Sequence, residues 1–213
     1  MPNQFRDAAH QQMLDAALDA AAAEVISRGW NGLRVRAIAE QIGVSRQTLY
    51  TAFSDKHGIS RALVMRHNER FLAGVEQAIG AHRELRAQLV AAVRFTLDTA
   101  ADDPLFRAVL AAESSEEFLP LITSGGAPIV VAARERLGAV FLALHPQLRR
   151  AELEVAAETV TRLTLSHILL PLHPTECVAD QIAELATRFL TQPPTPPEHA
   201  ALAHQRNPTV HSE

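Results

Sequence analysis

The sequence predicts an all-α protein of about nine helices, in which a small three-helix N-terminal domain precedes a larger helical domain. Three observations favour this class. Apolar residues make up 47% of the 213 residues, and alanine, the strongest helix former, is abundant. The apolar residues recur three and four positions apart, and no segment alternates in the way that strands do. Aromatic residues, which strands favour, account for only 5% of the chain.

The first helix is expected from about residue 6 to residue 28, because its main apolar positions fall on one face. Those positions are Leu14, Leu18, Ala21 and Val25. Gly29 ends this helix, since glycine suits the conformation found just after a helix, and the residues from Trp30 to Gly32 form a turn.

The segment from Val35 to Lys56 predicts two short helices joined by a tight turn. Each helix carries a narrow apolar stripe with four-residue spacing. The stripe residues are Ile38 and Ile42 in the first helix, and Leu49 and Phe53 in the second. Gly43 suits the left-handed conformation that ends a helix, and Val44 fills the angle between the two helices. Ser45 is placed to cap the second helix with its hydroxyl.

With these stripes turned inward, the second short helix offers a polar outer face. Gln47, Tyr50 and Thr51 share this face. Arg46 lies one turn before Tyr50. An amide, a phenol, a hydroxyl and a guanidinium on one exposed helix suit a DNA groove. The segment is therefore interpreted as a helix-turn-helix.

Ser54 is expected to cap a long fourth helix that reaches about residue 80, with Asp55 favourable to the helix dipole. Further helices are expected at about 82–101, 103–112, 127–144, 150–170 and 175–190, with a short helix and a loop between 113 and 128. The residues from Pro193 onward have the composition of a disordered tail. We therefore expect a helix-turn-helix domain over residues 1–54, a helical domain over 55–192 and a tail over 193–213.

Charge is distributed unevenly along the chain. Between residues 33 and 70 there are seven Arg or Lys and three acids, so this segment carries 7 − 3 = +4. The whole chain carries a formal net charge of −4, which leaves −4 − 4 = −8 for the rest. A basic module on an acidic body favours specific binding to DNA over general attachment to polyanions.

Three further features of the sequence indicate the cellular compartment of the protein. No apolar run approaches the roughly 20 residues that span a bilayer. The first residues lack the basic start and apolar stretch of a signal peptide. Cys177 is the single cysteine, so no disulfide can form within the chain. These features predict a cytoplasmic protein without a membrane segment.

The pattern resembles the TetR family of bacterial transcriptional regulators. The residues that carry the resemblance are the first helix, Gly29, Trp30, Val35 to Ala39, Gly43 to Ser45, Thr48 to Tyr50, Phe53 and Lys56. The likeness covers about the first 60 residues closely; beyond them only the number and order of helices agree. Departures from the family pattern are Arg34 in place of a capping Ser or Thr, Thr51 and Ala52 before Phe53, and Ser54 in place of a common Pro.

The resemblance implies that Tyr50 and Lys56 bind DNA phosphates and that the start of the recognition helix reads bases. A bidentate contact from Gln47 to adenine would contribute about 1–3 kcal/mol of discrimination. Arg46 could reach guanine or a phosphate, and the sequence leaves both open. The full set of expected DNA contacts is Arg34, Arg36, Ser45, Arg46, Gln47, Thr48, Tyr50, Thr51 and Lys56.

The resemblance also implies an effector cavity within the larger domain. Apolar residues of the middle helices predict a largely apolar cavity and hence a lipid-like effector such as an acyl chain or a hydrocarbon. The few polar groups expected there are Arg94, Thr161, Thr164 and His167. The expected lining residues are Arg94, Phe95, Leu105, Phe106, Leu110, Phe118, Leu121, Phe141, Thr164 and His167.

The last two helices carry more apolar surface than one domain needs, which predicts a homodimer. The expected interface residues are Leu163, Leu170, Ile182, Leu185 and Phe189. His167, His173 and Cys177 could suggest zinc, but Pro171 and Pro174 interrupt the helix and no fourth ligand is evident. We therefore expect neither a metal nor a cofactor.

These features predict a sequence-specific transcriptional regulator, a repressor that a small apolar effector releases from a pseudo-palindromic operator. One alternative is a helical enzyme, such as a di-iron carboxylate protein. That chemistry needs Glu-x-x-His pairs, and no Glu here precedes a His at that spacing. Another alternative is a nonspecific architectural DNA binder, which would be more basic.

Overall fold

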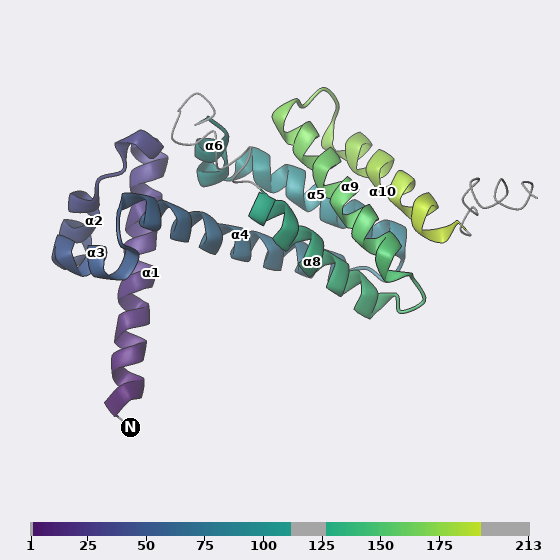
Figure 1. Cartoon of the computed structure of the whole chain (residues 1–213). Coiled ribbons are helices and arrows are strands. Elements are labelled where there is room, and N and C mark those ends of the chain that lie inside the picture. Colours follow the sequence, from purple (N-terminus) through teal and green to yellow (C-terminus); the bar gives the residue numbers. More distant parts are fainter. Residues whose placement is uncertain (1, 112–126, 193–213) are drawn as a thin grey trace, which may run out of the picture.

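The computed structural model describes residues 2–111 and 127–192, with side chains described for residues 5–108 and 131–192. Within these ranges the protein consists of nine α-helices and one 3-10 turn, and no residue is in a strand (Figure 1). The elements are α1 (Pro2–Arg28), η1 (Trp30–Gly32), α2 (Val35–Ile42), α3 (Arg46–Phe53), α4 (Lys56–Gly80), α5 (Leu85–Asp102), α6 (Pro104–Ala111), α8 (Ala127–Leu144), α9 (Arg150–Leu169) and α10 (Thr175–Thr191). The all-α prediction is confirmed. The expected tail and most of the expected short helix and loop at 113–128 lie outside the described residues.

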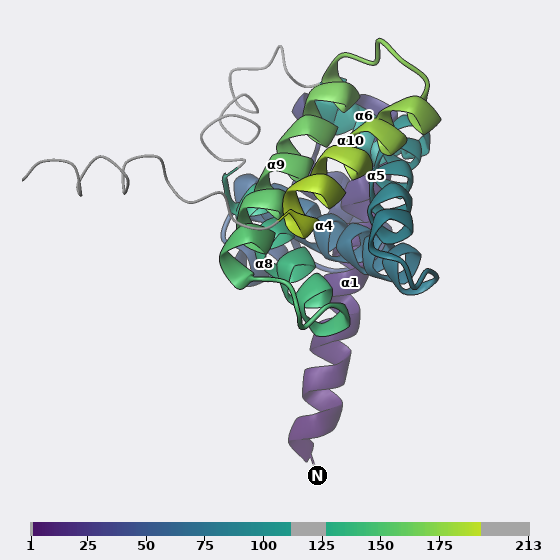
Figure 2. The same cartoon turned by 90° about the vertical axis from the view of Figure 1, so that its right-hand side faces the viewer.

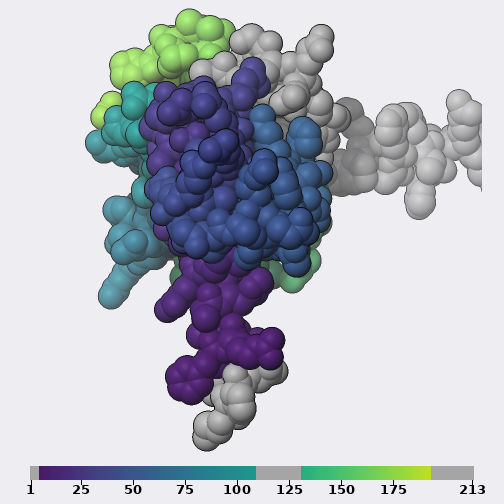
Figure 3. All heavy atoms as spheres, turned by 90° about the vertical axis from the view of Figure 1, so that its left-hand side faces the viewer, coloured from purple at the N-terminus to yellow at the C-terminus, as the bar shows by residue number. Residues whose placement is uncertain are grey.

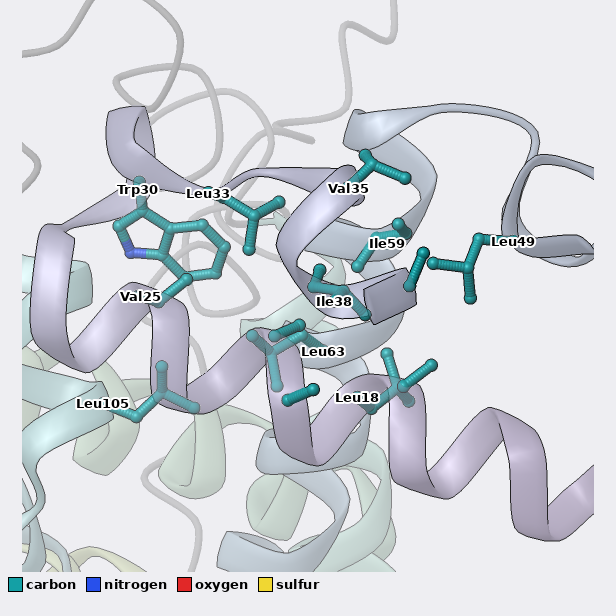
Figure 4. Packing of buried hydrophobic residues seen from close by; sticks show 14 residues of the cluster. Leu18, Val25, Trp30, Leu33, Val35, Ile38, Leu49, Ile59, Leu63 and Leu105 are labelled. Carbon is teal, nitrogen blue, oxygen red and sulfur yellow. The ribbon is translucent and has the colours of Figure 1, made fainter. Parts of the chain in front are cut away.

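The N-terminal domain is built on one apolar core. Helices α1, α2 and α3 pack with the first turns of α4 around it, and the core also receives Leu105 from α6 (Figure 4). The buried members are Ala17, Leu18, Ala20, Ala21, Val25, Trp30, Leu33, Val35, Ile38, Ala39, Leu49, Ile59, Leu63 and Leu105. Arg66 links α4 to α1 beside this core, because its guanidinium donates hydrogen bonds to the Asp15 carbonyl oxygen (3.0 Å) and to Asp19 Oδ1 (2.7 Å).

The turn between α2 and α3 is the one that the sequence predicts. Gly43 takes the left-handed conformation (φ 71°, ψ 31°) at the end of α2. Ser45 Oγ accepts a hydrogen bond from the Thr48 backbone N–H at 3.0 Å and so caps α3. Gly29 also adopts positive φ (71°) at the end of α1, as expected.

The start of α4 differs from the prediction. Asp55, not Ser54, caps this helix, because Asp55 Oδ1 accepts a hydrogen bond from the Gly58 backbone N–H at 2.7 Å. Ser54 instead ends α3 with φ 70°. The chain turns from α3 into α4 within two positions through this positive-φ residue, which leaves the capping role to its neighbour.

The larger domain is organised around α4, whose 25 residues span about 37 Å. It leads away from the N-terminal domain, with α5 and α8 packed along it and α9 and α10 outside them (Figures 1 and 2). Gly74 lets α5 approach closely, because a Cβ there would overlap the Phe95 ring. Arg136 ties α8 to α4 by ion pairs with Glu69 and Glu76.

Helix α6 starts where the sequence predicts. Asp103 Oδ1 accepts a hydrogen bond from the Phe106 backbone N–H at 2.9 Å and so caps the helix. His67 of α4 lies close to the same carboxylate, with its Nε2 3.5 Å from Asp103 Oδ2. Burial lowers the pKa of His67, although the Asp103 charge opposes this shift. These contacts attach the beginning of α6 to the middle of α4.

Candidate nucleic-acid interface and interior cavity

Helix α3 presents a polar face to solvent because Leu49 anchors its other side. Leu49 is fully buried, whereas Arg46, Gln47 and Tyr50 are exposed, Tyr50 by 40%. None of the three polar side chains has a hydrogen-bond or ion-pair partner among the described residues. An amide, a phenol and a guanidinium on this face are therefore available to an external partner.

The other hydroxyls of this helix are already engaged. Ser45 Oγ lies 2.9 Å from Thr48 Oγ1 and accepts the helix-capping hydrogen bond. Thr51 Oγ1 donates to the Gln47 carbonyl oxygen at 2.9 Å. All three residues are exposed, but the Thr51 hydroxyl hydrogen and one of the two hydroxyl hydrogens of Ser45 and Thr48 serve α3 itself. The structure thus divides the expected contacts of α3 into free groups and groups that stabilise the helix.

Basic side chains flank α3. Arg34 is exposed at the start of α2, and Lys56 is half-buried at the start of α4. Neither has an ion-pair partner among the described residues. Arg36 differs, because its Nε donates to Glu40 Oε1 at 2.7 Å, which raises the pKa of Arg36. Figure 3 shows the face on which α2, α3 and the start of α4 form one continuous surface.

A second feature is a cavity of about 100 Å³ inside the larger domain, between α4, α5, α6, α8 and α9. Its walls are almost entirely apolar. The lining residues are Asn68, Phe71, Leu72, Val75, Ala92, Val93, Thr96, Phe106, Ala133, Leu137, Val160, Thr161, Thr164, Leu165 and Ile168. Phe71 lies at the centre of an aromatic cluster, with ring centroids 6.0 Å from Phe95 and 6.3 Å from Phe106.

Two residues of the expected cavity set, Phe106 and Thr164, line this cavity. Others lie elsewhere. Leu105 is buried in the N-terminal core, and Phe141 is 6% exposed in a different core cluster. Arg94 is exposed on α5 and forms ion pairs with acids on α5 and α10.

Phe95 contacts the Phe71 ring but is not in this lining, and it lines a separate hollow together with Arg94. His167 is half-buried outside the lining. Leu110 belongs to α6, but its side chain lies outside the described residues, as do Phe118 and Leu121.

Helix α4 contributes to this cavity, which the sequence did not lead us to expect. Asn68, Phe71, Leu72 and Val75 line it from that helix. Their spacing of three and four residues places them on one helix face, which is a signal that the sequence contains. An asparagine within an otherwise apolar stripe marks a site where a polar group faces the interior.

Some of the expected interface residues are exposed and others are buried within the chain. Leu170, Leu185 and Phe189 are 60%, 62% and 45% exposed. Ile182, in contrast, is 3% exposed and packs within its own chain against Val93, Leu97, Val178 and Ala179, so its predicted place in an interface is wrong. Leu163 is partly buried against the same cluster. The reason is that one face of α10 packs on α5.

Among the residues that the structure describes, no three His, Cys, Asp or Glu side chains come together as metal ligands. The same described ranges contain no helix that combines the length and the apolar character needed to cross a bilayer.

Two family models match separate parts of the chain. The model for bacterial regulatory proteins of the tetR family matches residues 17–63, and the model for the bacterial tetracyclin repressor C-terminal domain matches residues 84–188. The first match contains α2, α3 and their surroundings, and the second contains α5 to most of α10. The chain belongs to the TetR family.

As a TetR-family protein it is a helix-turn-helix transcriptional regulator. It is 28% identical over 187 residues to the HTH-type transcriptional regulator AlkX of Mycobacterium tuberculosis, a match that covers 87% of this chain and 88% of that protein. It is 37% identical over 79 residues to the HTH-type transcriptional activator FasR of Mycolicibacterium smegmatis, covering 37% of this chain and 36% of that protein.

A solved structure supports the same assignment. The TetR-family repressor AlkX of a Dietzia species, described as implicated in biodegradation of n-alkanes, superposes with a TM-score of 0.68 at 26% identity. The superposition covers 82% of this chain and 96% of that structure. The family resemblance that the sequence suggested is therefore confirmed.

Proposed function

We propose that this TetR-family regulator is a cytoplasmic, dimeric repressor that leaves its operator when a small apolar effector enters the cavity. Residues 1–54 bind DNA in this proposal, and residues 55–192 bind the effector and the second subunit. The observation that carries the proposal is the course of α4. Lys56 stands at its DNA-proximal start, and Phe71, Leu72 and Val75 line the cavity further along the same helix.

The joint between α3 and α4 is suited to transmit movement. Asp55 caps α4 through Gly58 N–H, and its own backbone N–H donates to the Phe53 carbonyl oxygen at 2.9 Å. A Cβ at Gly58 would overlap that same carbonyl oxygen. The end of α3 and the start of α4 are therefore in close contact, so a rotation of α4 carries the recognition helix with it.

Helix α6 supplies a second link. Its neighbouring residues point in different directions, because Leu105 is buried in the N-terminal core while Phe106 lines the cavity. A ligand that displaces the Phe106 ring also displaces the helix that carries Leu105. This arrangement couples cavity occupancy to packing against α1 (Figure 4).

The size of the cavity supports a change of shape on binding. An apolar cavity of about 150 Å³ holds a molecule the size of benzene. The cavity here is about 100 Å³, so a longer effector must push its walls apart. A preference for the expanded state of about 1.4 kcal/mol weakens operator binding tenfold.

Dimerisation is assigned to the outer faces of α9 and α10, which lie side by side and remote from α2 and α3 (Figures 1 and 2). Val155 and Leu169 of α9 and Leu185 and Phe189 of α10 are each at least 45% exposed. A two-fold axis at this surface would present two α3 helices to successive major grooves, about 34 Å apart.

The proposed test uses labelled DNA from both flanks of the gene and purified protein in an anisotropy titration at fixed salt. We expect site-selective binding by a dimer, with release when a medium-chain apolar compound is added. Binding that ignores DNA sequence and that no apolar compound relieves refutes the proposal. Because one relative is described as an activator, in vitro transcription with the same DNA then distinguishes repression from activation.

A further inference from the structure

Among the described residues that line the cavity, Asn68 is the one whose side-chain hydrogen-bonding groups all lack a partner. The three threonine hydroxyls in its wall each donate to a carbonyl oxygen of their own helix: Thr96 to Ala92 (2.8 Å), Thr161 to Ala157 (2.7 Å) and Thr164 to Val160 (2.8 Å). Asn68 of α4 has no hydrogen-bond partner among the described residues, and it is half-buried in the cavity wall.

The described lining contains no charged residue. The arginines of α4 and α8 that lie within two positions of lining residues are exposed or engaged elsewhere: Arg70 is exposed, and Arg134 pairs with Glu158. Arg66 binds aspartates of α1, and Arg136 pairs with Glu69 and Glu76. Residues 109–130, whose side chains lie outside the description, include three Glu and no Lys, Arg or His, so they cannot provide a cation.

A carboxylate or phosphate that is buried in this cavity would lose its hydration without gaining a counter-charge from the described lining residues. Burying an unpaired charge costs far more than burying a neutral polar group. A primary amide, in contrast, can both donate and accept a hydrogen bond. It therefore matches a hydroxyl, carbonyl or ester group at the end of an apolar chain.

We propose that the effector is an uncharged molecule with an apolar body and a single hydrogen-bonding group, and that Asn68 binds that group. This inference rests on the proposed function of the cavity. It makes Asn68 the residue that distinguishes an oxygenated neutral compound from both the bare hydrocarbon and the corresponding acid. The contact also lies on α4, the helix that joins the cavity to α3.

The test compares three probes of equal chain length, 1-octanol, n-octane and octanoate at pH 8, with the full-length dimer. Affinity is measured from the rise in Tm with probe concentration, and DNA release is measured by anisotropy. We expect 1-octanol to bind and to release DNA, with octanoate at least about tenfold weaker. Asn68→Leu should weaken 1-octanol about fivefold, the effect of one lost hydrogen bond, and change n-octane by less than about twofold.

Thr96→Val is the matched control, because this cavity hydroxyl is already bonded within α5. It should leave the ratio of 1-octanol to n-octane affinity unchanged. Should Asn68→Leu not fold, Asn68→Ala provides the same comparison. Two results overturn the inference but leave the proposed function intact. One is octanoate that binds and releases DNA as well as 1-octanol does. The other is an equal loss of affinity for 1-octanol and for n-octane in the Asn68 variant. If no probe binds the wild-type protein, the effector role of the cavity fails, and this inference fails with it.

Discussion

Leu105→Ala tests whether α6 connects the two parts of the molecule. Leu105 is 6% exposed and belongs to the N-terminal core, although it lies in a helix of the larger domain. Truncation of a buried leucine to alanine costs about 2–5 kcal/mol, according to how far the cavity collapses. Because α6 can settle partly against α1, we expect a loss at the lower end, about 2–3 kcal/mol.

For a protein of this size that loss corresponds to a fall in Tm of roughly 5–10 °C. Urea unfolding measures the change in the free energy of unfolding, and hydrogen exchange followed by mass spectrometry shows which residues are destabilised. We expect faster exchange in residues 17–63, because the variant removes a contact from their core.

Leu89→Ala is the matched control, since Leu89 is 4% exposed in a core cluster of the larger domain. It should cost a similar free energy but accelerate exchange in α5 and α10 and leave the N-terminal core unaffected. A cost of less than about 1 kcal/mol for Leu105→Ala, or an exchange pattern that matches the control, would contradict the proposed role of α6.

Three other changes test separate contacts. Gly58→Ala forces a Cβ onto the Phe53 carbonyl oxygen. Urea unfolding should show a loss of about 1–3 kcal/mol in the free energy of unfolding, and anisotropy should show weaker DNA binding. Gly80→Ala is the control, because its Cβ meets no atom within 4 Å, and it should change neither quantity. Arg66→Met removes charged hydrogen bonds to α1 from a side chain that is 15% exposed, so unfolding in urea should show a loss of about 1–2 kcal/mol. Burial lowers the pKa of His67 below 6.5, so the unfolded chain takes up its proton first and stability is lost as the pH falls below that value. His67→Gln should flatten the decline in Tm on acidification, and an unchanged decline would contradict this assignment.

The helix-turn-helix could be predicted from the sequence because its signals are local. Gly43 and Ser45 determine the turn and the cap through contacts with residues a few positions away. The sequence predicts the cap of α4 one residue too early, since Ser54 and Asp55 are both good caps. The choice between them depends on the turn that the packing of α3 against α4 requires.

The sequence predicts that the cavity is apolar but not which residues line it. Its apolar nature follows from composition, but the residues that face it depend on how helices pack. Leu105 and Phe106 are neighbours of similar polarity, yet Leu105 packs in the N-terminal core and Phe106 lines the cavity. Ile182 likewise packs on α5 rather than on a second subunit, because which face of α10 meets α5 is a tertiary property that periodicity cannot assign.

The exposed face of α3 is the part of the molecule on which the account depends most. Its direct test is anisotropy at fixed salt with flanking DNA and with the double variant Gln47→Ala/Tyr50→Ala, against the exposed α4 control Gln77→Ala. Loss of a bidentate base contact and a phosphate contact in each subunit should weaken specific binding by at least about 100-fold, with Tm and circular dichroism unchanged. Undiminished, site-selective binding by the folded double variant would contradict the account.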